Sequence, residues 1–103
     1  MKIYIQELSF QASIRLIEFT EDKVKNLSQF NDEITEAHVT LKVDRSGTKH
    51  DRLCQIRLAI PGNDAIASKQ CQSFEEAILQ TCEALKRQLS NKKPLGKGPA
   101  ILI

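Results

Sequence analysis

The charged side chains of this chain are unevenly distributed, and its C-terminal segment carries only cations. Residues 1–83 carry ten basic and thirteen acidic side chains, whereas no acidic residue follows Glu83. The cations beyond that point are Lys86, Arg87, Lys92, Lys93 and Lys97. One basic end on a charge-separated chain favours binding to a polyanion. Cations near the end of a helix also complement its dipole, and charge alone leaves both interpretations open.

The histidines, cysteines and paired carboxylates give no catalytic or metal-binding pattern. His38 falls on the polar side of a predicted strand and His50 in a charged loop, and their spacing matches no metal site. Glu75 and Glu76 are adjacent, so they do not face each other on a helix. The cysteines are odd in number and widely spaced, which argues against a disulfide framework and a zinc site: Cys54, Cys71 and Cys82. We therefore expect no enzyme, no cofactor, no metal and no small-molecule substrate.

The hydropathy of the chain indicates a location in the cytoplasm. No stretch approaches the roughly 20 consecutive apolar residues that a membrane span requires. The N-terminus becomes polar at Gln6 and Glu7, too early for a signal peptide. Hydrophobic residues at 41% and charged residues at 27% are typical of a globular domain.

Hydrophobic periodicity predicts six elements. Alternation indicates strands, and apolar residues three or four positions apart indicate helices. Ser13 is expected to cap the first helix, and Ser73 to form a capping box with Glu76 on the second, which Pro94 and Gly96 should end. Turns are expected at Ser46-Gly47 and at residues 61–64. In chain order the elements are a strand at 2–5, a helix at 14–28, strands at 37–43, 54–60 and 65–71, and a helix starting near 74.

The order β-α-β-β-β-α predicts an α+β domain. The first two strands should be parallel because a helix joins them, and the later strands antiparallel because short turns join them. Two helices would cover one face of a four-stranded sheet. The other face should be polar, with Lys2, Tyr4, His38, Thr40, Lys42, Gln55 and Arg57. We expect the domain to span residues 1–93, and residues 94–103 to form a flexible tail with an apolar end capable of weak self-association.

Three stretches resemble the ribosome hibernation promoting factor family, also called the sigma-54 modulation or ribosomal subunit interface proteins. The first is the helix start at Ser13 with residues 19–24, and the second is residues 34–41. The third is Ala77-Ile78 followed by Leu85-Lys86-Arg87-Gln88-Leu89. The resemblance covers residues 1 to about 93 and is to a short form of the family.

The resemblance implies a fold similar to double-stranded RNA-binding domains, and no catalysis. It implies binding to ribosomal RNA in the channel of the small ribosomal subunit, where the protein would block messenger and transfer RNA during stress. The matched basic residues would contact phosphates: Lys23, Lys86, Arg87, Lys92 and Lys93. Arginine binds a phosphate in a bidentate way, so Arg87 is the strongest single candidate.

The chain also departs from the family pattern at four positions. Ser73 and Glu75 stand where the family usually has aspartate and tyrosine, and Ile17 and Ala84 where it has basic residues. These changes reduce the basic surface. They leave an alternative open, a protein-interaction module of the same fold that has lost ribosomal RNA binding.

Overall fold

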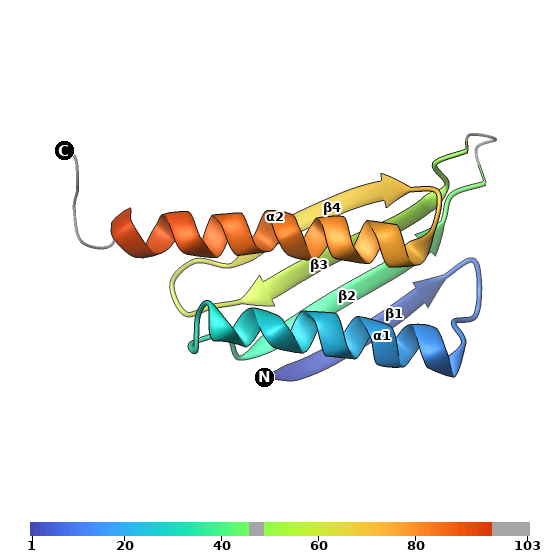
Figure 1. Ribbon diagram of the computed structural model, residues 1–103. Helices are drawn as coiled ribbons and strands as arrows, with labels where there is room; N and C mark the ends of the chain where they lie inside the picture. The colour runs from blue at the N-terminus through green and yellow to red at the C-terminus, as the bar shows by residue number, and fades with distance from the viewer. Residues whose placement is uncertain (46–48, 96–103) are drawn as a thin grey trace.

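The computed structural model describes the backbone of residues 1–45 and 49–95 and the side chains of residues 1–45 and 49–90. Its elements in chain order are β1 (Lys2–Leu8), α1 (Ile14–Lys25), the 3-10 helix η1 (Asn26–Gln29), β2 (Glu36–Val43), β3 (Arg52–Ala59), β4 (Ala65–Cys71) and α2 (Phe74–Leu95). Both helices lie on the same face of the sheet and run in the same direction (Figure 1). The predicted α+β class and element order are confirmed.

The four strands lie in their order along the chain, β1-β2-β3-β4. β1 pairs with β2 in parallel, and the two following pairs are antiparallel. Helix α1 packs on β1, and α2 packs on β3 and β4. The β1-α1-β2 crossover and the final helix α2 therefore lie over one face of the sheet, and the other face remains uncovered.

Serine side chains begin both helices, as their positions predict. The Ser13 hydroxyl accepts a hydrogen bond from the Leu16 backbone N–H at 3.1 Å. The Ser73 hydroxyl accepts one from the Glu76 N–H at 3.2 Å. Each satisfies one of the N–H groups that lack a partner in the first turn of a helix.

The core lies between the helices and the sheet. Helix α1 buries Leu16, Thr20 and Val24, and the alternate residues of β2 and β3 are buried opposite. Along α2 the buried stripe is Phe74, Ala77, Ile78, Thr81, Cys82, Leu85 and Leu89. The fully buried Thr81 hydroxyl shares its one hydrogen between the Ala77 carbonyl at 2.7 Å and the more distant Cys54 carbonyl at 3.3 Å. The hydrogen-bonding capacity of this buried hydroxyl is thus satisfied, and one of its two contacts joins α2 to β3.

Some element boundaries differ from the sequence prediction. Strand β1 continues past residue 5 to Leu8, because Gln6, Glu7 and Leu8 pair with β2 although their side chains break the apolar alternation. The first helix ends at Lys25 and tightens into η1. Residues 94 and 95, assigned to the tail from sequence, belong to α2. The predicted flexibility of 96–103 and the Ser46-Gly47 turn lie outside the described residues.

The uncovered face of the sheet carries the polar side chains that alternation placed there. Tyr4, His38 and Arg57 follow one another across three neighbouring strands, and Ile66 of β4 continues the row. The rings of Tyr4 and His38 stack with centroids 5.1 Å apart. The His38 Nε2 lies 2.9 Å from a Glu36 carboxylate oxygen. We refer to this surface as the open sheet face.

Two neighbouring residues on α2 allow a matched test of this packing. Ile78 is fully buried and Leu79 is 48% exposed. We expect Ile78→Ala to lower the free energy of unfolding by about 2–5 kcal/mol, and Leu79→Ala by about 0.5 kcal/mol. Urea denaturation of both variants measures the difference. Equal losses would mean that α2 is not seated on the sheet as described.

Candidate nucleic-acid interface

A groove runs between the end of α1 with η1 and the middle of α2. Its volume is about 210 Å³, and buried Leu27 and Cys82 lie at its base. We call it the interhelical groove. Its other lining residues are Lys23, Asn26, Phe30, Leu79, Glu83 and Lys86.

The positions of Lys23 and Lys86 follow from the buried stripes of their helices. Lys23 precedes buried Val24, and Lys86 follows buried Leu85. A step of one residue turns a helix by about 100°. Both lysines therefore flank the core stripe of their own helix, and both line the interhelical groove. The structure brings together two candidate residues that lie 63 positions apart in the sequence.

Both lysines keep their ammonium groups accessible. The Lys86 Nζ lies 5.6 Å from the centroid of the Phe30 ring and 3.5 Å from a Glu83 carboxylate oxygen. The Lys23 Nζ lies 5.5 Å from the Phe19 ring centroid and 3.9 Å from an Asp22 oxygen. Ion pairs at such exposed positions contribute only about 0–1 kcal/mol. An incoming phosphate could therefore displace them at little cost.

The other three candidate cations belong to the second half of α2. Arg87 is exposed and follows Lys86. On the helix it projects away from the buried stripe, so it extends the cationic surface beyond the groove. Lys92 and Lys93 lie in the last turns of α2, and their side chains are outside the described part of the chain.

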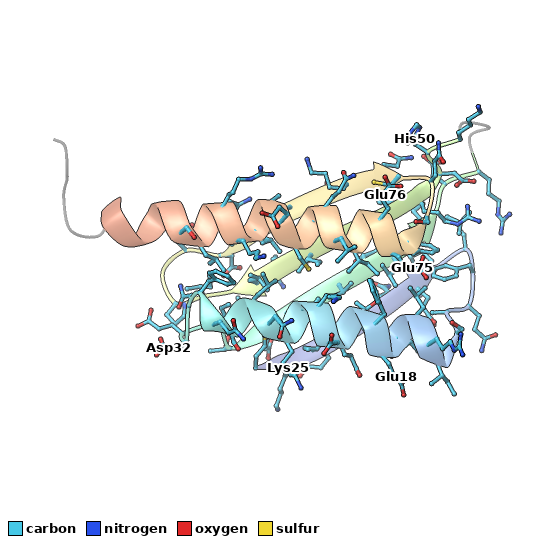
Figure 2. All side chains as sticks on the ribbon, viewed as in Figure 1. Glu18, Lys25, Asp32, His50, Glu75 and Glu76 are labelled. Atoms are coloured by element: carbon cyan, nitrogen blue, oxygen red, sulfur yellow. The ribbon has the colours of Figure 1, made fainter. Side chains whose placement is uncertain are left out.

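Acidic side chains occur at both ends of the two-helix surface: Figure 2 labels Asp32 beyond the end of α1, and Glu83 lines the interhelical groove. Figure 2 shows Glu75 and Glu76 at the start of α2, far from its C-terminal turns. Glu18 lies on the exposed side of α1, and Lys25 stands at the end of that helix (Figure 2). The net positive charge therefore comes from the second half of α2, where no acidic residue follows Glu83.

The residues capable of covalent chemistry are occupied or buried. Burial raises the pKa of the Cys54 thiol from 9.0 to about 12, and that of Cys82 to about 11. His38 is engaged by Glu36 and Tyr4. Within residues 1–45 and 49–95 no cluster of three or more His, Cys, Asp or Glu residues could hold a metal ion. No helix in this part of the chain is long and apolar enough to cross a membrane.

Sequence reasoning missed the apolar part of the groove. Phe30 lies between the predicted helix at 14–28 and the predicted strand at 37–43, and its ring packs against the core. Leu79 falls outside the buried stripe and is one of the large hydrophobic residues that remain exposed. An apolar residue outside the buried stripe of an amphipathic helix, as Leu79 is, was the sequence feature that could have predicted an apolar binding surface.

The raised thiol pKa values give a direct test of burial. At pH 8 a thiol with a pKa about two units higher than usual has a thiolate fraction about a hundredfold smaller. We therefore expect Cys54 and Cys82 of the folded protein to react with a thiol-specific disulfide reagent at least that much more slowly than in guanidinium chloride. Mass spectrometry of the labelled peptides reads out each site. Equal rates in the folded and unfolded protein would contradict the core packing.

Comparison with known proteins agrees with this architecture. The ribosomal subunit interface protein from Coxiella burnetii superposes with a TM-score of 0.80 at 22% identity, covering 90% of this chain and 98% of that one. The N-terminal domain of Protein Y from Thermus thermophilus gives a TM-score of 0.75 at 19% identity, covering 89% and 99%. At these identities the likeness establishes the fold.

Sequence comparison establishes the family. The ribosome hibernation promotion factor of Deinococcus radiodurans is 32% identical over 78 residues, which are 74% of this chain and 40% of that protein. Residues 3–94 match the family described as "Sigma 54 modulation protein / S30EA ribosomal protein". Membership in this family supports the expectation that the chain is not an enzyme. Since the match covers most of its length, this protein belongs to the sigma-54 modulation family of ribosome hibernation factors.

Proposed function

We propose that this protein is a translation inhibitor of the cytoplasm that binds the small ribosomal subunit and blocks its messenger and transfer RNA sites. The helices would face ribosomal RNA, and the contacts would be phosphates bound by Lys23, Lys86 and Arg87. Lys92 and Lys93 would add to the same basic end of α2. The inhibition would be steric, so it requires affinity and position but no chemical step.

One observation carries this proposal. Lys23 and Lys86 come from different helices and line the same groove. Arg87 adds a third cation beside them. Clustered cations from two rigid helices present fixed charges to the regularly spaced phosphates of RNA. The family match and the Deinococcus relative, a ribosome hibernation promotion factor by name, support the ribosome as the source of that RNA.

The open sheet face supports a second candidate function, protein interaction. Tyr4 is 47% exposed and Ile66 is 51% exposed on this face, which no helix covers. A second copy of the chain could pack there if ribosomal RNA binding has been lost. We expect sedimentation equilibrium to show a monomer at micromolar concentration under the first proposal. A dimer that Ile66→Lys dissociates would favour the second.

The main proposal predicts salt-sensitive binding through the two-helix surface. We expect the protein to co-sediment with small ribosomal subunits at low salt and to be released as the salt concentration rises, because phosphate contacts release counterions. The triple variant Lys23→Ala, Lys86→Ala, Arg87→Ala should bind more weakly, with a slope of log K against log salt reduced by about one per lost contact.

A charge-matched variant serves as the control. Lys42, Lys49 and Lys69 are exposed residues that do not line the interhelical groove. Replacing all three by alanine changes the net charge by the same amount. It should leave most of the binding intact. If both variants lose affinity equally, the contact is general electrostatics, and if the natural protein never sediments with small subunits, the proposed function is wrong.

A further inference from the structure

The interhelical groove is lined by apolar side chains as well as by cations, and phosphate binding requires only the cations. Cations alone are sufficient to neutralise the phosphates of a polyanion. Here the ring of Phe30 and the side chain of Leu79 line the space between the two lysines. This apolar lining calls for an explanation that the proposed function does not supply.

The dimensions of the groove restrict what it can accept. Its volume of about 210 Å³ is below the roughly 300–1,000 Å³ of pockets for drug-sized ligands. Leu79 is 48% exposed and Phe30 is half-buried, so an incoming group could cover apolar surface that now faces water. A single planar ring fits this description better than a helix or a strand of a partner protein, which would need a longer trough.

Polar groups surround the apolar lining. Lys23 and Lys86 both reach the groove, together with the side-chain amide of Asn26 and the carboxylate of Glu83. The Asn26 side chain is exposed, so its amide is accessible to a ligand. Amide and carboxylate groups can form hydrogen bonds with the edges of nucleobases, and ammonium groups can bind phosphates.

The Lys86 ammonium covers the ring of Phe30 in the unbound protein. Its ammonium lies 5.6 Å from the centroid of the Phe30 ring. A cation over an aromatic ring is held only weakly at an exposed site. A phosphate would offer Lys86 a stronger, charge-assisted contact and free the ring face for stacking.

We propose that the interhelical groove receives one unpaired RNA base, which contacts Phe30 and Leu79 while the flanking phosphates contact Lys23 and Lys86. This inference rests on the proposed function and deepens it, because it specifies single-stranded or looped RNA rather than a continuous duplex. Unstacked bases that pack on aromatic side chains are the usual basis of single-strand recognition.

The charges favour RNA over an apolar peptide as the occupant. Two lysines and one carboxylate, Glu83, line the groove and Arg87 lies beside it, so cations outnumber anions there; Glu75 and Glu76 are at the far end of α2. A neutral apolar side chain would make no charged contact with either lysine. A nucleotide satisfies both the apolar lining and the cations.

Two RNA probes of equal charge separate base insertion from phosphate binding. Each is a three-residue chain with abasic ends; one carries a central adenine and the other is abasic throughout. We expect the adenine probe to bind the natural protein between about fivefold and a hundredfold more tightly, the range set by base–aromatic stacking. NMR titration of the labelled protein at low salt measures both affinities and shows whether the groove residues respond.

Variants of exposed apolar residues provide the matched comparison. Leu79→Ala should reduce the affinity ratio of the two probes towards one, while Ile66→Ala, which removes an exposed apolar side chain from the open sheet face, should leave it unchanged. Equal binding of the two probes to the natural protein would overturn the base pocket, and so would binding of neither. Ribosome co-sedimentation is measured separately, so the proposed function can stand when the base pocket fails.

Discussion

Helix α2 buries one side against β3 and β4, and the positions of the other functional elements depend on that burial. Ile78 and Leu85 are fully buried along this side. This buried stripe fixes the rotation of the helix, and the Thr81 hydroxyl lies 3.3 Å from the Cys54 carbonyl oxygen of β3. With the rotation fixed, Lys86 must face η1, and Arg87 must face away from the sheet. The same constraint places Leu79 between the core and solvent.

Much of this arrangement could be predicted from the sequence, because local rules determine it. Strand alternation and helical spacing gave the element order, and Ser13 and Ser73 gave the helix starts. The parallel pairing of β1 with β2 followed from the helix that connects them. These features depend on neighbouring residues and on short connections, which a single sequence displays directly.

The rest depends on contacts between distant segments. No local pattern states that Lys23 and Lys86 line one groove, since that depends on the lateral packing of α1 against α2. The packing of Phe30 against the core could not be predicted from local periodicity, because Phe30 follows the 3-10 helix η1 and lies outside the regular helix. The full length of β1 could not be predicted because the residues after Ile5 break the apolar alternation. Backbone pairing with β2, rather than side-chain burial, holds this part of the strand in place.

Structure determination of the protein bound to small ribosomal subunits tests the central claim most directly. Electron cryo-microscopy of the complex would show which surface meets RNA. The account predicts that the interhelical groove, with Lys23, Lys86 and Arg87, contacts ribosomal RNA and that the open sheet face does not make the main contact. A complex in which Tyr4 and Ile66 face the ribosome while the two helices face solvent would contradict it.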